Sequence, residues 1–171
     1  VVLTGAGGKA FVSGADISKF ESERAGEEAV RRYNAMVENI YSSIYRFPKP
    51  TIAMIRGYCI GGGLGLAVCC DYRVCTPGSK FALPAAKLGL GYGYPGLRRF
   101  IDQIGPTHTR DIFYTSRQLD AEEARAIGIV SRVVADDALE TYVGDYARTI
   151  AENAPLTVSA IKYITTEALK P

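Results

Sequence analysis

The chain has 171 residues, of which 47% are apolar and 22% are charged, and its 20 Lys and Arg nearly balance its 18 Asp and Glu. This composition fits one globular domain over residues 1–171 with a substantial core, and it argues against a second full domain. Basic residues form no continuous tract, so we expect no nucleic-acid partner. No apolar run reaches the roughly 18 residues that a membrane-spanning helix needs, so we expect no membrane partner.

The first elements follow from the apolar pattern. Residues 1–4 predict a short buried strand, and the glycine-rich residues 5–9 predict a loop after it. From about residue 26 to residue 47, apolar or aromatic residues recur at the spacing of an amphipathic helix. Pro48 and Pro50 end that helix, because proline disfavours helical backbone at and before its own position.

The second part of the chain repeats the alternation of strand and helix. Residues 51–55 predict a buried strand, and residues 64–70, apolar on all sides, predict a buried helix. Residues 71–75 and 80–83 predict strands on either side of a Pro-Gly turn, and the remainder reads as helical except for 129–134. Asp120 and Glu123 have the spacing of a capping box. We therefore expect a mixed α/β fold with crossover connections.

Four cysteines, one histidine and one aspartate are candidate functional residues by residue type. The cysteines have no metal-ligand spacing and no nearby histidine, so buried thiols in a reducing cytoplasm, and no metal, are the favoured interpretation. His108 precedes a predicted helix away from the glycine loops and is expected on the surface. Asp71 is interpreted as a structural carboxylate that caps backbone or pairs with Arg73. The cysteines are Cys59, Cys69, Cys70 and Cys75.

Two glycine-rich turns are the strongest candidates for a ligand site. They span residues 11–17 and 57–64, each after a predicted strand, and the second opens a helix. Glycine lets backbone N–H groups approach a ligand, and a helix start supplies unpaired donors. Neither turn has the pattern of a P-loop, of a dinucleotide-binding loop or of a nucleophile elbow. From spacing alone, ligand binding and tight packing both remain open.

Several ordered blocks give the chain a resemblance to a known superfamily. They include Gly-Lys-Ala-Phe-Val-Ser-Gly-Ala-Asp-Ile at 8–17, Lys-Pro-Thr-Ile-Ala at 49–53, the glycine triplet at 61–63 and Cys-Asp-Tyr-Arg at 70–73. Lys-Leu-Gly-Leu at 87–90 and Ala-Glu-Glu-Ala at 121–124 continue the same order. Together these blocks resemble the crotonase superfamily of enoyl-CoA hydratases and isomerases over most of the chain.

This resemblance implies a fold, an assembly and a site. The fold would be a ClpP/crotonase-like spiral of repeated ββα units, assembled as trimers or dimers of trimers, with a coenzyme A thioester as substrate and no covalently bound cofactor. The backbone N–H groups of Ala15 and Gly62 would form an oxyanion hole. The resemblance also implies earlier strands and later helices, which we expect this chain to lack, and because it starts without Met we expect a segment of a longer protein. The same resemblance implies substrate contacts at Ser13, Asp16, Ile17, Tyr58, Ile60 and Gly61.

Asp16 has two possible roles: it could cap a helix, or it could lie near the nucleotide of the substrate. The helix cap is favoured.

The chain departs from the hydratase pattern at two positions. Hydratases of this superfamily carry two glutamates that activate water, and the corresponding residues here are Gly65 and Ala85. Neither can transfer a proton, so efficient hydration is not expected. Tyr92, in a loop that also holds Tyr94, resembles the tyrosine that malonyl-type acyl-CoA decarboxylases place near the substrate carboxylate. For both tyrosines, packing is the simpler interpretation.

The sequence thus favours an acyl-CoA lyase or isomerase with an oxyanion hole and an atypical acid, and decarboxylation through Tyr92 is its sharpest version. A hydratase with groups supplied from elsewhere and a non-catalytic acyl-CoA-binding protein are the alternatives. RNA binding, seen in an occasional relative, is disfavoured because no basic stripe is present.

Overall fold

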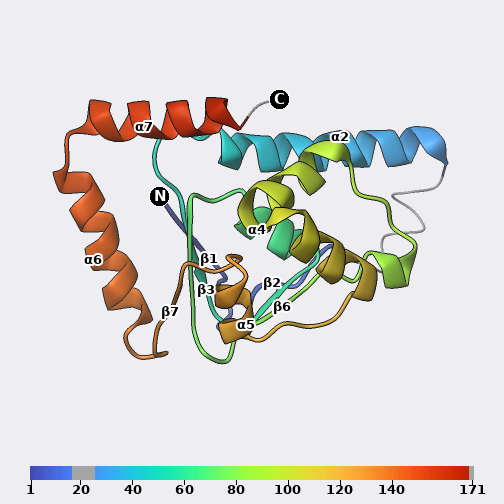
Figure 1. Cartoon of the computed structure of the whole chain (residues 1–171), viewed down its shortest axis with the longest axis horizontal. Helices are drawn as coiled ribbons and strands as arrows, with labels where there is room; N and C mark the ends of the chain where they lie inside the picture. The colour runs from blue at the N-terminus through green and yellow to red at the C-terminus, as the bar shows by residue number, and fades with distance from the viewer. Residues whose placement is uncertain (17–25, 170–171) are drawn as a thin grey trace.

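The computed structural model describes residues 1–16 and 26–169. The chain alternates strands and helices along its length (Figure 1). The strands are β1 (Val2–Thr4), β2 (Ala10–Val12), β3 (Ile52–Ile55), β4 (Tyr58–Ile60), β5 (Tyr72–Cys75), β6 (Lys80–Ala82) and β7 (Arg132–Val133). The helices are α2 (Glu27–Tyr45), α3 (Gly62–Ala67), the 3-10 turn η2 (Ala86–Leu88), α4 (Tyr94–Thr115), α5 (Ala121–Ala126), α6 (Leu139–Glu152) and α7 (Pro155–Ala168).

Within the described residues, the strands form two parallel sheets. One sheet has the order β1-β3-β5-β7, and the other has the order β2-β4-β6. Each successive pair of strands therefore contributes one strand to each sheet and is followed by helix or turn, which confirms the predicted spiral of ββα units. Parallel neighbours need crossover connections, as the sequence predicted.

The second sheet shows where the sequence prediction fell short. The predicted glycine-rich turns, 11–17 and 57–64, overlap β2 at residues 11–12 and contain the whole of β4 at 58–60. Each of these strands is only 3 residues long. A strand of that length shows no detectable alternation, and its backbone pairing is set by the neighbouring strand rather than by its own side chains. The predicted helix 64–70 begins earlier and ends earlier than expected, at 62–67.

The main hydrophobic core lies between the two sheets and the helices α3, α4 and α5. It includes Phe11, Leu64, Phe81 and Phe100, each no more than 5% exposed. A smaller core between the first sheet and α6 contains Val74 and Leu139 among other residues. In Figure 1, α4 and α5 lie over the strands, whereas α6 flanks them and α7 runs in line with α2.

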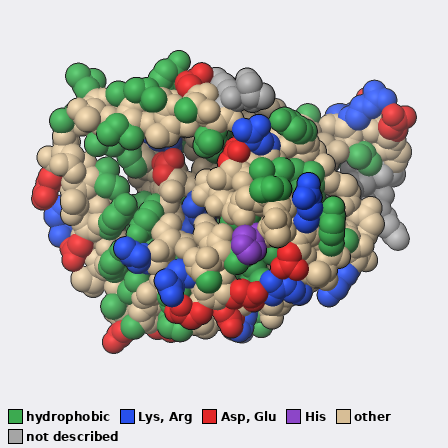
Figure 2. All heavy atoms as spheres, viewed as in Figure 1, with side chains coloured by type: hydrophobic (Ala, Val, Ile, Leu, Met, Phe, Trp, Pro, Cys, Tyr) green, Lys and Arg blue, Asp and Glu red, His purple; other side chains and the backbone are tan. Residues whose placement is uncertain are grey.

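Helix α4 is a pair of helical segments joined at a kink. Gly105 has a φ of 72°, which interrupts the helical backbone, and Pro106 starts the second segment. His108 lies in the first turn after the kink and is exposed, as expected, on the face shown in Figure 2. On that face basic and acidic side chains are interspersed. The next helix begins as predicted, since the Asp120 side chain accepts a hydrogen bond of 2.9 Å from the Glu123 N–H.

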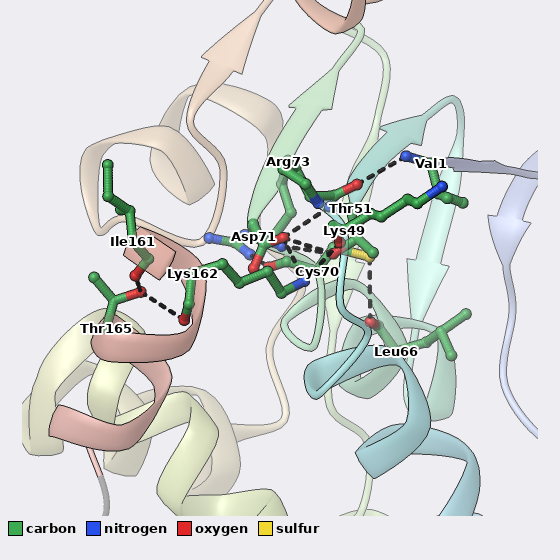
Figure 3. Close-up of polar contacts among 11 residues, drawn as sticks. Val1, Lys49, Thr51, Leu66, Cys70, Asp71, Arg73, Ile161, Lys162 and Thr165 are labelled. Atoms are coloured by element: carbon green, nitrogen blue, oxygen red, sulfur yellow. Dashed lines mark hydrogen bonds and ion pairs between the residues drawn. The ribbon is translucent and has the colours of Figure 1, made fainter. Parts of the chain in front are cut away.

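Asp71 is a structural carboxylate that accepts a backbone N–H, which confirms one of its two predicted roles, whereas the alternative pairing with Arg73 is not formed. One carboxylate oxygen accepts hydrogen bonds from the Thr51 N–H at 2.7 Å and from the Lys162 ammonium at 2.7 Å (Figure 3). Arg73, predicted as its partner, instead donates to the carbonyls of Cys70 and Ile129 at 2.5 and 2.6 Å. The expected Asp71–Arg73 pairing is therefore wrong, because the buried guanidinium is used to bind backbone carbonyls.

Candidate active site

A pocket of about 350 Å³ lies where the ends of the second sheet meet α2. This volume is in the range of small-molecule sites. Its walls are the loops that follow β2, β4 and β6, one face of α2, and the segment that leads into α4. The lining residues are Ser13, Gly14, Ala15, Tyr33, Asn34, Val37, Glu38, Tyr41, Ile60, Gly61, Gly62, Pro84, Ala85, Leu88, Leu90, Gly91, Tyr92, Gly93, Pro95 and Gly96.

The two glycine-rich turns of the sequence come together in this pocket. A Cβ atom added to Gly14 would lie 3.5 Å from the Ile60 carbonyl oxygen, so the two turns touch. Gly61 has a φ of 56°, a backbone conformation that favours glycine, and donates its N–H to the Ala82 carbonyl at 2.8 Å. A Cβ on Gly63 would lie 2.0 Å from the Val12 carbonyl oxygen. The start of α3 is thus pressed against the end of β2, which only glycine permits.

Ala15 and Gly62, the predicted donors, both line this pocket from separate turns. Gly62 is the first residue of α3, so its N–H has no acceptor within the helix. Neither position depends on a side chain, and the closeness of the two turns is what brings the two backbone segments to one cavity.

The other predicted contact residues divide into three groups. Ser13, Ile60 and Gly61 line the pocket. Asp16 and Tyr58 are not among its lining residues, and the Tyr58 side chain is 52% exposed. Ile17 lies outside the described residues, as does any helix that Asp16 would cap. Both interpretations of Asp16 therefore stay predictions.

Tyr41 is among the pocket residues that sequence reasoning missed. Its hydroxyl donates a hydrogen bond of 2.9 Å to the Gly62 carbonyl oxygen. Burial, with a smaller contribution from the neighbouring Tyr92, raises the pKa of the Tyr41 phenol above its ordinary value. Tyr41 follows Val37 by one helical turn, and this spacing was the available signal. The amphipathic pattern over residues 26–47 predicted the helix, and the face that carries Val37 and Tyr41 forms a wall of the pocket.

Tyr92 also reaches the pocket, where packing holds its ring. The ring meets Phe113 edge-on, with centroids 4.8 Å apart and an interplanar angle of 82°. Burial raises the pKa of Tyr92 to about 12, so the phenol stays protonated at neutral pH. Tyr94, its neighbour in the predicted glycine-tyrosine loop, is 66% exposed and does not line the pocket.

Glu38 is the only carboxylate among the lining residues that the structure describes, and it is engaged elsewhere. Its two oxygens accept hydrogen bonds from the Arg99 guanidinium at 2.5 and 3.1 Å, and the Ser42 hydroxyl donates at 2.6 Å. Burial alone would raise the pKa of Glu38, but these donors outweigh it and hold the pKa below its ordinary value. Glu38 is therefore a poor proton donor, and as a base it is weakened by its partners.

Gly65 and Ala85, where the resemblance implies the hydratase glutamates, have different surroundings. Ala85 lines the pocket with a methyl group. Gly65 is buried in α3, where the Tyr41 ring covers it. The described residues contain no group of three or more His, Cys, Asp or Glu side chains placed to hold a metal ion. The four cysteines are free and buried, as the sequence predicted.

The comparisons with known proteins agree with this arrangement. The family model described as Enoyl-CoA hydratase/isomerase matches residues 1–171. The chain belongs to the enoyl-CoA hydratase/isomerase family. This confirms the crotonase resemblance. In the part of the chain that the structure describes, no helix has both the length and the apolar character to span a membrane.

Individual relatives show the extent of the similarity. A crotonyl-CoA hydratase of Syntrophomonas wolfei is 34% identical over 170 residues, which cover 99% of this chain and 65% of that protein. A short-chain-enoyl-CoA hydratase of Clostridium acetobutylicum is 33% identical over 162 residues, 95% of this chain and 61% of that protein. The chain thus spans less than two thirds of these curated relatives.

Solved structures give the same family. An enoyl-CoA hydratase/carnithine racemase from Magnetospirillum magneticum superposes with a TM-score of 0.96 at 38% identity, over 100% of this chain and 64% of that one. A methylmalonyl-CoA decarboxylase in complex with 2-nitronate-propionyl-CoA superposes with a TM-score of 0.87 at 27% identity, over 98% of this chain and 64% of that one. Proteins named for different reactions therefore share this fold.

Proposed function

We propose that the protein binds a coenzyme A thioester and stabilises its enolate with the backbone N–H groups of Ala15 and Gly62. The observation that carries this proposal is that these two residues, from two separate glycine-rich turns, line one pocket. Fixed N–H donors aimed at a developing oxyanion each contribute on the order of 3 kcal/mol to lowering a barrier. The names of the relatives, which are enoyl-CoA and crotonyl-CoA hydratases, support a thioester substrate.

The reaction we propose is not hydration. Adding water to a double bond needs a group that deprotonates water and a group that protonates carbon. By the family resemblance these groups would stand at Gly65 and Ala85, which have no titratable side chain. Glu38 is held ionised by Arg99 and Ser42. The titratable side chains that remain among the described pocket residues are Tyr33, Tyr41 and Tyr92.

Decarboxylation of a malonyl-type thioester fits this set of residues. Loss of carbon dioxide leaves the enolate directly, so no base is required, and a neutral phenol is sufficient as the partner of the leaving carboxylate. Tyr92 lines the pocket and its raised pKa keeps it protonated. The similarity to a methylmalonyl-CoA decarboxylase structure supports the same reaction.

The first experiment incubates the full-length protein separately with methylmalonyl-CoA and with crotonyl-CoA, and follows each thioester and carbon dioxide release by mass spectrometry. We expect release from methylmalonyl-CoA that falls strongly in a Tyr92→Phe variant, and no hydration of crotonyl-CoA at an enzymatic rate. Hydration at an ordinary rate would contradict the argument from Gly65 and Ala85.

A second measurement tests the oxyanion hole without any turnover. Acetoacetyl-CoA has an enolate that absorbs in the ultraviolet, so we expect the full-length protein to increase the enolate absorbance when it binds this ligand at neutral pH. Binding of acetoacetyl-CoA without that increase would contradict the proposed role of the Ala15 and Gly62 N–H groups as an oxyanion hole. An increase in enolate absorbance without turnover of any acyl-CoA would favour the alternative that the protein binds acyl-CoA but is not catalytic.

On the resemblance alone, we also propose assembly as trimers or dimers of trimers and a cytoplasmic location. Exposed apolar side chains on α7 offer a surface for assembly, since Leu156 and Tyr163 are 84% and 66% exposed. Light scattering of the full-length protein after gel filtration measures the oligomeric state. A monomer would contradict the proposed assembly.

A further inference from the structure

Tyr41 occupies the space that a side chain at position 65 would need. A Cβ atom on Gly65 would lie 2.8 Å from the Tyr41 hydroxyl oxygen and 3.1 Å from the ring carbon that bears it. Cβ atoms in proteins essentially never approach other atoms below 3.0 Å. The phenol of Tyr41, on α2, therefore fills the space beside Gly65 of α3, and its hydroxyl is a polar group at that position.

The hydroxyl of Tyr41 is next to the proposed oxyanion hole. It donates to the carbonyl of Gly62, the same residue whose N–H is the proposed donor to the thioester oxygen. The α-carbon of a thioester is bonded to the carbonyl carbon, so a substrate whose oxygen meets the Gly62 N–H has its α-carbon in this neighbourhood. Rotation of the hydroxyl about its bond to the ring redirects its proton from Gly62 into the pocket without moving the ring.

The phenol can donate a proton but cannot act as a base at neutral pH. Burial raises the pKa of Tyr41 well above its ordinary value, and the neighbouring Tyr92 adds to the effect. An enolate carbon is far more basic than a phenolate, so proton transfer from Tyr41 to that carbon is favourable. The same phenol cannot remove a proton from water or from an unactivated α-carbon. Such a site protonates enolates that bond cleavage produces.

We propose that Tyr41 is the catalytic acid that protonates the α-carbon of the enolate, and that the substrates are acyl-CoA thioesters with a carboxylate on the α-carbon. This inference rests on the proposed decarboxylation.

In the first step the bond between the α-carbon and the carboxylate breaks, carbon dioxide leaves, and the electron pair moves onto the thioester oxygen at Ala15 and Gly62. In the second step the α-carbon takes the proton of the Tyr41 hydroxyl. The phenolate then recovers a proton from water, so one proton is consumed for each carbon dioxide released.

The two pocket tyrosines would then have separate tasks. Tyr92 lies on the loop between η2 and α4, whereas Tyr41 comes from α2 and touches α3. We assign Tyr92 to the leaving carboxylate and Tyr41 to the α-carbon. Substitution of Tyr92 should therefore slow carbon dioxide release, and substitution of Tyr41 should change how the product is protonated.

The experiment follows both events in one reaction. Full-length protein in excess reacts with methylmalonyl-CoA in deuterium oxide for a single turnover, which is quenched before the α-proton of the substrate exchanges. Carbon dioxide release and the configuration of the 2-deuteriopropionyl-CoA product are measured. We expect the unaltered protein to form one enantiomer in large excess, because a fixed donor delivers the deuteron to one face of the enolate.

In Tyr41→Phe we expect carbon dioxide release to fall by less than about tenfold, because the bond-breaking step needs no acid, while the product becomes nearly racemic. Tyr45→Phe is the matched control, since Tyr45 lies on the same helix but does not line the pocket, and it should keep the single enantiomer. Tyr92→Phe should slow release and keep the enantiomer as well. A loss of structure in Tyr41→Phe would lower both readouts together.

Gly65→Ala provides a second variant if Tyr41→Phe does not fold, because its methyl group must displace the Tyr41 hydroxyl, and the product should again be nearly racemic. A single enantiomer from Tyr41→Phe or from folded Gly65→Ala would overturn the assignment of Tyr41 while leaving the decarboxylase proposal intact. No carbon dioxide release by the unaltered protein would reject the decarboxylation, and this inference with it.

Discussion

The hydroxyl of Tyr41, on α2, occupies the space that a side chain at Gly65, on α3, would need. The Tyr41 hydroxyl oxygen would lie 2.8 Å from a Cβ atom at position 65, and it is anchored by its hydrogen bond to the Gly62 carbonyl. The absence of a side chain at Gly65 therefore has two consequences. It leaves position 65, where the resemblance implies a hydratase glutamate, without a titratable group, and it admits the phenol of Tyr41 to the wall of the pocket.

This relationship predicts that Gly65→Ala destabilises the fold. The added methyl group overpacks a buried site, and we expect a loss of about 1 to 3 kcal/mol in the free energy of unfolding, measured by urea denaturation. In a Tyr41→Ala background the same substitution should cost much less, because the clashing atoms are gone. Gly144→Ala is the control, since a Cβ there meets nothing within 4 Å, and it should be neutral or slightly stabilising. If Gly65→Ala lowered the free energy of unfolding equally with Tyr41 and with Ala at position 41, the clash between Tyr41 and a side chain at position 65 would be contradicted.

The Glu38–Arg99 pair should stabilise α2 against α4 in a pH-dependent way. The pKa of Glu38 is held below its ordinary value, so its contribution is present above that value and is lost as the pH falls through the lowered pKa. We expect Glu38→Gln to cost about 1 kcal/mol near pH 7, at the low end for charged hydrogen bonds because the Glu38 side chain is 36% exposed. The cost should vanish in acid. Glu122→Gln, which alters a pair whose carboxylate is 66% exposed, should have almost no effect at either pH.

The anchoring of α7 should depend on Asp71. Its carboxylate accepts the Thr51 N–H and the Lys162 ammonium, and Thr51 is only 2% exposed. Asp71→Ala leaves the buried N–H of Thr51 without its acceptor, so we expect a loss of about 1 to 2 kcal/mol by urea denaturation. Asp145→Ala is the control, because Asp145 is 61% exposed, and it should cost almost nothing.

Lys162→Met separates the helix contact from the backbone contact, because it removes only the ammonium. We expect faster amide hydrogen exchange in α7 with little change in the exchange of β3. If α7 and β3 exchanged faster together, the contact would stabilise the whole domain rather than this helix.

The four cysteines should be inert in the folded protein. They are free and buried, and burial raises the pKa of Cys69 and Cys75 to about 12 and that of Cys70 to about 11. Because the thiolate is the reactive form, we expect iodoacetamide at neutral pH to label none of them in folded protein and all of them in urea. Mass spectrometry counts the labels. Rapid labelling of any one cysteine without urea would contradict its burial.

The buried thiols, together with two buried phenols, should lower the free energy of unfolding at alkaline pH. The thiols and the phenols of Tyr41 and Tyr92 keep their protons in the folded state at pH values where the unfolded chain has lost them. The unfolded state then binds fewer protons, so the free energy of unfolding decreases as the pH rises above about 9. Urea midpoints at pH 7 and about pH 10 measure this decrease. Tyr41→Phe should reduce the slope, and a slope unchanged by that variant would mean that Tyr41 titrates normally.

The amino-acid sequence by itself determined the elements and the family. The periodic segment predicted α2 correctly, and the Asp120 cap was predicted from its spacing. The positions of β1, β3 and β5 were also predicted, but β1 was expected to be buried and is largely exposed. These features are local, because helical periodicity, apolar runs and capping depend on residues near one another in the chain. The ordered sequence blocks were sufficient to indicate the crotonase superfamily, which the family model confirms.

Only the tertiary structure decided which side chains meet. β2 is a strand because it pairs with β4, and β4 is a strand because it pairs with β2 and β6. The residues of β2 and β4 do not by themselves indicate a strand. Asp71 pairs with Lys162, which is 91 residues away, rather than with nearby Arg73. The sequence pattern did not single out Tyr41, and its hydroxyl meets Gly62, 21 residues later in the chain, only because α2 packs against α3. Contacts of this kind depend on how helices and sheets pack, and a linear pattern does not specify that packing.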